Sequence, residues 1–282
     1  TLLVYDLVEW CRTQDIMVGP GRGSSAGSLV YYLLGITSVD PLEHRLLFER
    51  FLSPDRIDQP DCDLDFEDAR REEVGKYLRE KYGEESVAQI ATVMQLKGKS
   101  CLKDVARVWE VPFNEANQVT SAIITRAAGD ERAFHTVEDS FKENAACAAF
   151  AERYPEVYQF TVLAEGLHRQ MGMHAAGVVV SSTPVFEIVP LEAKTEDGVQ
   201  TKFIAVDKDG VEQLGLLKLD VLGLKTLTQL KATLRAVRER KGDDIDLEKL
   251  EFDDKRVLKR FTNQEFVGVF QFDSSSVAKL SE

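Results

Sequence analysis

The stretch DCDLDFED, residues 61–68, alternates acidic with apolar side chains. Successive side chains of a β-strand point to opposite faces, so this alternation predicts a strand with Asp61, Asp63 and Asp65 on one face and apolar residues on the other. Carboxylates at this spacing repel one another unless a cation neutralises them. The row is therefore either a solvated sheet edge or a set of oxygen ligands for a hard divalent cation such as Mg²⁺.

A calcium-binding loop is a further interpretation of the same stretch. Counted from Asp61, acids fall on the first, third and fifth places of the EF-hand pattern, and Glu72 falls on its last place. Phe66 occupies the place where that loop needs glycine for a sharp turn. A Ca²⁺-binding module therefore remains an alternative with one residue that does not fit.

A third carboxylate lies in the apolar strand pattern LLKLDVLGL, residues 216–224. Strand alternation places Lys218 and Asp220 on one face and leucine and valine side chains on the other. An unpaired Lys and Asp are unfavourable to bury inside an apolar strand. The segment is thus expected either to face a polar cleft or to hold a structural ion pair.

The glycine-rich stretch VGPGRGSSAGSLVYY, residues 18–32, lies between an expected short strand at 15–18 and an expected helix at 24–34. Backbone N–H groups at a helix N-terminus favour an anion. The stretch lacks the Gly-Lys-Ser/Thr of a P-loop, but Arg22 beside several serines forms a donor-rich loop. Such a loop suits a polyphosphate.

A dinucleotide site is the alternative for this loop. Gly21, Gly23 and Ala26 match part of the G-x-G-x-x-A fingerprint, and Asp40 lies about twenty residues further on, where a ribose-binding acid is expected. However, the expected strand is short, no βαβ repeat follows, and such a protein has no use for the acidic row. The loop thus leaves a dinucleotide-dependent oxidoreductase as a weaker possibility.

Composition limits the class of protein. The chain has 282 residues, of which 44% are hydrophobic, enough for a sizeable core in two or three subdomains. A net charge of -13 argues against a generic nucleic-acid binder, so basic residues must act locally. The four cysteines are scattered, and no apolar run approaches the roughly 18 residues of a membrane span. We expect a soluble, cytoplasmic piece of a longer polypeptide, with reduced thiols and no membrane partner.

Hydrophobic periodicity predicts an α/β fold that is interrupted by a helical block over 99–168. Pro112 and Pro155 mark helix starts within that block. Outside it, helices are expected over 2–14, over 70–82 and from about Lys225, and strands over 86–93, 175–181, 201–206 and 211–222.

Six segments of this chain resemble, in the same order and at similar spacing, the C family of DNA polymerases, the α subunits of bacterial replicative DNA polymerase III. The matching segments are GPGRGSSAGSLVYYLLGIT (19–37), LLFERFLSPDR (46–56), PDCDLDF (60–66), HAAGVVV (174–180), LGLLKLDVLGLKTLT (214–228) and GVFQFDS (268–274). The resemblance covers essentially the whole chain and is loose between about 110 and 165. Asp273 stands where the family usually has Glu, which puts only a local contact in doubt.

The resemblance implies a palm domain with a nucleotidyltransferase fold like that of polymerase β and a mixed β-sheet. This palm is expected over 1–94 and 173–224, with a helical thumb inserted over 95–172 and the start of helical fingers over 225–282. Because the fingers are incomplete, the chain alone is expected to be a poor polymerase.

The resemblance also implies the chemistry, which is transfer of a deoxynucleotide from dNTP to a primer 3′-hydroxyl with release of pyrophosphate. The family's catalytic aspartates correspond to Asp63, Asp65 and Asp220, which would bind two Mg²⁺ ions, with Mn²⁺ as a substitute; Asp61 would be a neighbour. The two ions lower the pKa of the hydroxyl and stabilise charge on the phosphates. Primer-template DNA and dNTP are the expected partners, together with replicase subunits such as a sliding clamp through regions outside this sequence.

Two further groups of residues complete the expected site. The residues expected to contact the nucleotide are Arg22, Gly23, Ser24, Ser25, Lys218, Arg50 and His174. Residues expected to contact DNA phosphates from the thumb are Lys99, Lys103 and Arg107. The latter recur every four residues and so share one helical face, a pattern that also occurs on ordinary solvated helices.

Overall fold

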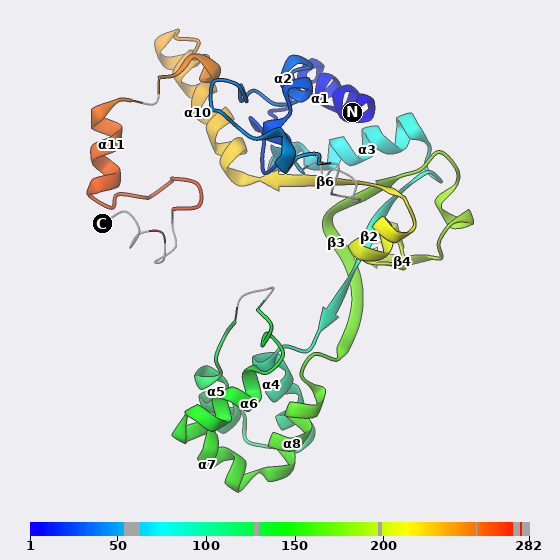
Figure 1. Ribbon diagram of the computed structural model, residues 1–282, viewed down its shortest axis with the longest axis vertical. Coiled ribbons are helices and arrows are strands. Elements are labelled where there is room, and N and C mark those ends of the chain that lie inside the picture. Colours follow the sequence, from blue (N-terminus) through cyan, green and yellow to red (C-terminus); the bar gives the residue numbers. More distant parts are fainter. Residues whose placement is uncertain (54–62, 127–129, 197–198, 252, 273–276, 278–282) are drawn as a thin grey trace. The chain divides into compact units, whose positions relative to one another are not determined.

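The computed structural model describes residues 1–53, 63–126, 130–196, 199–251, 253–272 and 277. The chain divides into two compact units, one formed by Thr1–Ile90 with His174–Glu282 and the other by Ala91–Met173 (Figure 1). The chain enters the second unit within one strand and leaves it within another. None of the helices in the described ranges is both long and apolar enough to cross a membrane.

The described residues form one sheet of six strands, in the order β1-β6-β3-β2-β5-β4. The strands are β1 Asp63–Glu67, β2 Val87–Gln95, β3 His168–Val180, β4 Leu191–Glu196, β5 Val199–Ile204 and β6 Leu217–Leu224. Strand β6 runs parallel to β1 and antiparallel to β3, and β5 runs parallel to β2 and antiparallel to β4. The expected α/β class with a mixed sheet is therefore confirmed.

Helices α1 and α3 cover one face of the sheet in the first unit (Figure 1). The helices of this unit are α1 Leu2–Thr13, α2 Leu29–Leu33, α3 Arg71–Tyr82, α9 Lys208–Gln213, α10 Lys225–Lys241 and α11 Lys255–Thr262. Phe66, Val178 and Val180 pack into the core beneath α1 and α3, whereas Val179 joins a second apolar cluster. Because strand side chains alternate, Asp63 and Asp65 project from the face opposite to α1 and α3.

The second unit is a bundle of short helices with its own core. Its helices are α4 Gly98–Val108, α5 Phe113–Ala122, α6 Thr136–Glu143, α7 Ala145–Arg153 and α8 Pro155–Ala164. Pro155 is the first residue of α8, where its missing N–H and fixed φ are tolerated, and the Asn144 side chain caps α7. The expected helical block over 99–168 is confirmed for most of its length, and the predicted thumb range, 95–172, lies inside this unit.

The segment around the glycine loop differs from the expectation. The expected strand at 15–18 is only a single bridge between Val18 and Phe66. The expected helix at 24–34 begins at Leu29, because the Ser28 hydroxyl accepts a hydrogen bond from the Tyr31 N–H and caps α2 there. The 3₁₀ turn Ser25–Gly27 precedes it.

Two strand predictions were also wrong in extent. Val211 lies in α9 rather than in a strand, because the Asp207 side chain accepts a hydrogen bond from the Gly210 N–H and starts a helix. Strand β4, which was not predicted, is the edge strand, and its described side chains are mostly exposed. An exposed edge strand needs no apolar alternation, so periodicity could not detect it. Strand β3 begins at His168 instead of at residue 175.

Candidate active site

Strands β1 and β6 bring acids from distant parts of the sequence together. Asp63 and Asp220 are register partners in the parallel pair, and Asp65 follows two residues later on the same face of β1. The apolar neighbours of these aspartates are buried, since Leu64 is 5% exposed and Phe66 is fully buried. The predicted acidic face is therefore present for these three residues, while Asp61 and Cys62 lie outside the described residues.

The glycine loop begins directly beside this strand. The Gly19 N–H donates to the Asp65 carbonyl at 2.8 Å, and the Glu67 N–H donates to the Met17 carbonyl at 3.0 Å. A β-carbon at position 19 would lie only 3.0 Å from Asp65 Cβ, so this close approach favours glycine. The segment before the loop thus lines the outer edge of β1, and the loop starts at the carboxylates.

The residues at the turn of the loop point to those carboxylates. Arg22 Nε donates to Asp65 Oδ2 at 3.1 Å, and Arg22 Nη2 lies 3.0 Å from Asp65 Oδ1. Gly23 has a φ of +59°, and a β-carbon there would lie 3.7 Å from Asp63 Oδ2. Ser25 is buried, and its hydroxyl donates to the Arg22 carbonyl at 2.7 Å. Ser25 therefore shapes the turn, while Arg22 and Gly23 face the acids.

The Asp65 carboxylate is incompletely compensated. Its side chain is 10% exposed, and among the described residues Oδ1 receives no hydrogen bond, because Arg22 approaches it outside hydrogen-bonding geometry. Burial raises the pKa of Asp65 above its ordinary value, although the charge and hydrogen bond of Arg22 act in the opposite direction. A second cation would thus stabilise the ionised form.

The strand β6 carries the ion pair that was one of the two interpretations of its sequence. Lys218 Nζ lies 3.2 Å from Asp220 Oδ2, and the two side chains are only 12% and 16% exposed. Register places this pair next to Asp63. The pair therefore belongs to the acidic face and balances part of its charge.

The three aspartates provide the oxygen donors that Mg²⁺ prefers, on two adjacent strands. In this structure, however, Asp65 is paired with Arg22 and Asp220 is paired with Lys218. In the part of the chain that the structure describes, no three acidic, His or Cys side chains converge as a ready metal site. The donor chemistry of the three aspartates fits a divalent cation.

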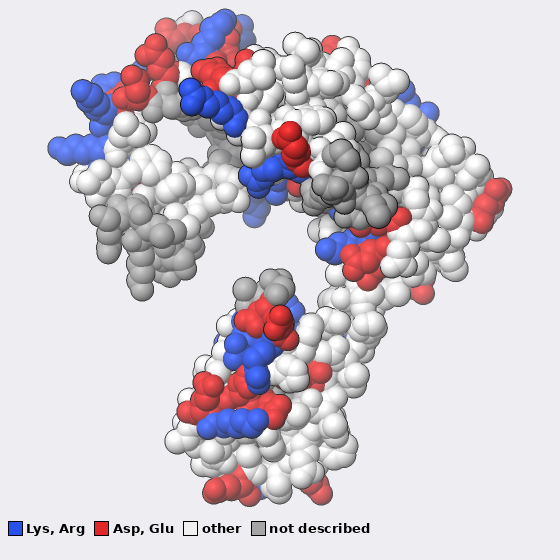
Figure 2. Space-filling view, viewed as in Figure 1, with Lys and Arg blue, Asp and Glu red and all other residues white. Residues whose placement is uncertain are grey.

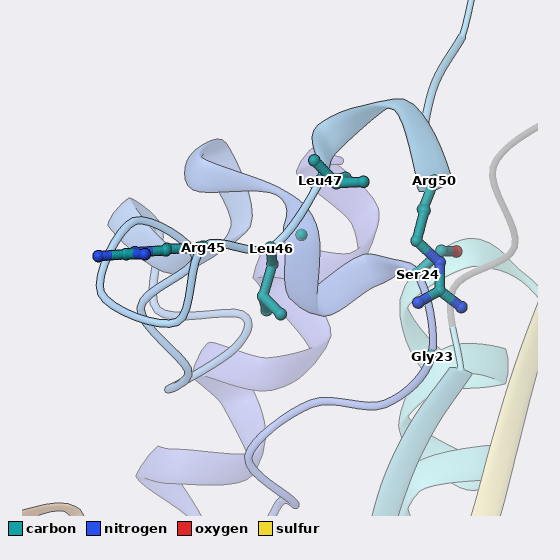
Figure 3. A pocket seen from close by; sticks show the side chains of 7 residues that line it. Gly23, Ser24, Arg45, Leu46, Leu47 and Arg50 are labelled. Carbon is teal, nitrogen blue, oxygen red and sulfur yellow. The ribbon is translucent and has the colours of Figure 1, made fainter.

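A pocket of about 240 Å³ lies beside the glycine loop (Figure 3). It is lined by Gly23, Ser24, Gly27, Arg45, Leu46, Leu47 and Arg50. Arg50 lies next to Ser24 and Gly23, whereas Arg45 extends away from them (Figure 3). The predicted residues Gly23, Ser24 and Arg50 thus share one pocket, and Arg45 is an addition that no sequence pattern indicated.

His174 lies in β3, which pairs with the strand β6 that carries Asp220. Its Nδ1 accepts hydrogen bonds from the backbone N–H groups of Gly177, at 2.5 Å, and Ala176, at 3.2 Å. An Nδ1 that accepts leaves the imidazole proton on Nε2. Gly177 is the register partner of Asp220, so His174 lies near the acidic end of the sheet.

Glu67 is a buried acid that the sequence interpretation missed. It continues the odd-numbered face of β1, is 4% exposed, and accepts a hydrogen bond from Lys231 Nζ at 2.9 Å. Strand alternation could have pointed to Glu67, but its partner lies 164 residues away in α10 and carries no sequence signal of its own.

The predicted DNA contacts lie on α4 of the helical unit. Lys99, Lys103 and Arg107 are all exposed. Arg107 is paired with Asp104 at 3.2 Å, and Asp104 also contacts Arg169 at 3.0 Å. Figure 2 shows basic and acidic side chains interspersed on this unit. The stripe is present as a surface feature, and part of its charge is balanced.

The two alternative sites do not fit the structure. Phe66 lies inside β1, so the sharp turn of an EF-hand does not occur there. The glycine loop leads into a 3₁₀ turn and a helix of five residues, without the strand and long helix of a dinucleotide fold. Asp40 instead accepts hydrogen bonds from the backbone of Leu42 and Glu43 in a turn.

Comparison with protein families gives two matches that together cover almost the whole chain. Residues 1–223 match the bacterial DNA polymerase III alpha NTPase domain, and residues 226–282 match the bacterial DNA polymerase III alpha subunit finger domain. A DNA polymerase family implies divalent metal ions, which agrees with the donor chemistry of the acidic face.

Individual relatives support the same assignment. The chain is 42% identical over 276 residues to the DNA polymerase III subunit alpha of Thermus aquaticus, which covers 98% of this chain and 22% of that protein. It is 40% identical over 304 aligned residues to the Aquifex aeolicus subunit, with 99% and 26% covered, and 42% identical over 279 residues to the Yersinia pestis subunit, with 99% and 23% covered. The chain spans about a quarter of the length of these relatives. The chain therefore belongs to the bacterial DNA polymerase III alpha subunit family.

Proposed function

We propose that this chain forms the catalytic core of a template-directed DNA polymerase, which transfers a deoxynucleotide from dNTP to a primer 3′-hydroxyl and releases pyrophosphate. The observation that carries the proposal is the meeting of the β1–β6 carboxylates with the Arg22 loop. Carboxylates for metal binding and a donor-rich loop for phosphates are the parts that phosphoryl transfer requires side by side.

In this proposal the domains have distinct tasks. Residues 1–94 and 173–224 form a palm related to the polymerase β nucleotidyltransferase fold, 95–172 form the thumb, and 225–282 begin the fingers. The mixed sheet with the helical unit emerging between β2 and β3 supports this division.

Asp63, Asp65 and Asp220 would hold two Mg²⁺ ions, or Mn²⁺ in their place. When bound, such ions supply Lewis-acid stabilisation of the charge that develops on the transferred phosphoryl group and on pyrophosphate. Asp65 Oδ1, which accepts no hydrogen bond from the described residues, and the register of Asp63 with Asp220 support this ligand set. No protein general base is needed, since the carboxylates act as ligands.

Arg22 and Lys218 have a second task in this proposal. With metal ions bound to the aspartates, the side chains of Arg22 and Lys218 would neutralise the triphosphate. Gly23 and Ser24 present the loop to the phosphates, and Arg50 adds charge from the same pocket. Ser25 holds the loop from inside through the Arg22 carbonyl.

The remaining predicted residues act around this centre. The Nε2–H of His174 is a donor for substrate near Asp220. On α4, the exposed residues Lys99, Lys103 and Arg107 contact duplex phosphates, which positions primer-template DNA without reading its sequence. Replicase partners such as a sliding clamp would bind through regions outside this sequence.

The test uses the full-length protein that carries this chain. Asp220→Asn is expected to lower single-nucleotide incorporation by at least about 10³-fold, because a ligand of the transition-state charge is lost. The exposed Asp244→Asn is the matched control and should be unchanged. Incorporation by Asp220→Asn within tenfold of the wild-type rate would overturn the assignment of that carboxylate.

A binding experiment on this chain separates the proposal from the two alternatives. Calorimetry should detect weak dNTP binding that depends on Mg²⁺, while primer extension by the chain alone stays poor because the fingers are incomplete. Binding of a nicotinamide dinucleotide, or of Ca²⁺ with no effect of dNTP, would favour the oxidoreductase or the calcium module instead.

A further inference from the structure

A partly buried ion pair joins α10 to the end of β1. Lys231 Nζ lies 2.9 Å from Glu67 Oε1, and the two side chains are 26% and 5% exposed. None of the roles given above uses either residue, although Glu67 follows Asp65 by two positions in the same strand. Charges that are buried as a pair are costly to separate, since removing one partner leaves the other uncompensated.

Glu67 also holds the segment that leads into the glycine loop. Its Oε1 accepts a hydrogen bond from the Met17 N–H at 3.0 Å, while its own N–H donates to the Met17 carbonyl at 3.0 Å. Two residues later, Gly19 donates to the Asp65 carbonyl. Arg22 follows in this loop and pairs with Asp65, so the segment that Glu67 contacts leads directly to Arg22.

Lys231 also reaches the turn that follows α1. Its Nζ donates to the backbone carbonyl of Asp15 and lies 3.2 Å from the Asp15 carboxylate. Carbonyls at a helix C-terminus lack intrahelical partners, so a cation is favourable there. A hydrogen bond of 3.3 Å from the Ala69 N–H to Thr228 Oγ1 fixes α10 against the turn after β1.

We propose that Lys231 is a positioning residue for the acidic face: by neutralising Glu67 it fixes the end of β1 and the start of the glycine loop, and so keeps Asp65 and Arg22 in register with Asp220. This inference rests on the proposed polymerase function. A direct contact of Lys231 with DNA phosphate is less well supported, because its Nζ already binds two carboxylates and a carbonyl.

The kinetic test compares variants of the full-length protein. Lys231→Met should lower kcat for primer extension by about tenfold or more while the KM for dNTP stays within about twofold, because a small misplacement of the acids affects the reaction more than nucleotide binding. Lys231→Arg keeps the charge and should stay within about threefold of the wild type. Lys249→Met is the matched control, since it breaks a Lys–Asp pair of 2.8 Å whose lysine is 83% exposed.

A double variant tests whether Lys231 affects activity through Glu67. In Lys231→Met with Glu67→Gln no buried charge is left unpaired, and the glutamine oxygen can still accept from Met17. The double variant should therefore recover most of the activity that Lys231→Met loses. The inference would be overturned if the double variant lost as much activity as Lys231→Met, or lost the sum of the two single-variant losses. A raised KM, with an activity that depends less steeply on salt, would also overturn it and would favour a substrate or DNA contact.

Hydrogen exchange gives a readout that needs no polymerase activity. The amides of Gly19 and Glu67 should exchange faster in folded Lys231→Met than in wild type or in Lys249→Met, while those of α3 are unchanged. Unchanged exchange would overturn the inference.

If the wild type extends no primer, the proposed function fails, and the exchange measurement still decides whether Lys231 is a positioning residue. Should Lys231→Met not fold, Lys231→Gln, which keeps a donor for Glu67, serves in both measurements with the same expected direction.

Discussion

Two aspartates, one in each unit, lie beside arginine side chains but differ in how well their charge is satisfied. Asp139 of the helical unit is 8% exposed and receives hydrogen bonds from Arg126 Nη2 at 2.8 Å and from Arg132 Nε at 2.9 Å, with a second bond from Arg132 to its other oxygen. Asp65 has a similar exposure, 10%, and among the described residues it is paired with a single arginine, Arg22.

The pKa directions follow from these surroundings. Hydrogen bonds from Arg132, together with the charges of Arg132 and Arg126, lower the pKa of Asp139 against the effect of burial. For Asp65 burial is the largest influence and raises the pKa, because Arg22 alone does not offset it. A satisfied buried carboxylate belongs to the structure of its unit, whereas an unsatisfied one beside two other acids indicates a site that needs another cation.

The largest effect expected from this comparison is on catalysis. Asp65→Asn in the full-length protein should lower nucleotide incorporation by at least about 10³-fold, or about 4 kcal/mol of transition-state stabilisation, with little loss of thermal stability. Single-turnover incorporation and a melting curve on the same sample test both parts. Asp139→Asn is the counterpart and should leave incorporation by folded protein unchanged; a similar loss in both variants would remove the distinction.

The exposed cations of the helical unit should act on a partner rather than on the fold. Replacing Lys99, Lys103 and Arg107 together by Ala should weaken primer-template binding by about tenfold for all sequences alike, and reduce the slope of log affinity against log salt by about two to three. Fluorescence anisotropy at several salt concentrations measures both quantities. The control is Lys142→Ala, which changes an exposed lysine of the same unit. An unchanged slope in the triple variant would show that Lys99, Lys103 and Arg107 form an ordinary solvated face without DNA contacts.

Asp139→Asn should lower thermal stability more than Asp65→Asn does, which is the opposite of their expected order for nucleotide incorporation. Asp139→Asn removes the negative charge and one of the two acceptor oxygens that Arg126 and Arg132 share, so the melting temperature of the helical unit should fall by several degrees. Asp130→Asn, which weakens the contact of 3.7 Å with Arg126 and keeps an oxygen for the hydrogen bond of 2.8 Å from the Arg132 N–H, should have a smaller effect. Equal melting temperatures for Asp139→Asn and the wild type would show that Asp139 does not support the fold.

The smallest expected effect is a difference in pH dependence, measured by urea unfolding between about pH 3 and about pH 7 with divalent metals chelated. The raised pKa of Asp65 means that its contribution to stability is full below its ordinary value of 3.8 and is lost as the pH rises through the raised pKa. The lowered pKa of Asp139 means that its contribution is full above 3.8 and is lost as the pH falls through the lowered pKa. Asp65→Asn should flatten the first change and Asp139→Asn the second; identical profiles would contradict the assigned directions.

The sequence by itself determined the alternating strand of Asp63 and Asp65, the charged helix α3, and the helical block between the two halves of the sheet. These features depend on local periodicity, with period two for strands and 3.6 for helices, and on proline and glycine at element ends. Six ordered segments also identified the family. The position of the α2 cap was missed because Ser24, Ser25 and Ser28 are all suitable caps, and only packing selects Ser28.

Only the tertiary structure decided which charges meet. Asp63 and Asp220 are 157 positions apart, and Glu67 and Lys231 are 164 apart, so no local pattern links them. The sequence of β1 does not show which cation pairs with each acid. In the described structure Asp65 pairs with Arg22, whereas Glu67 pairs with the distant Lys231. Burial and the distance to a cation set the difference, and both are fixed only when β1 packs between the glycine loop and β6, with α10 at its end.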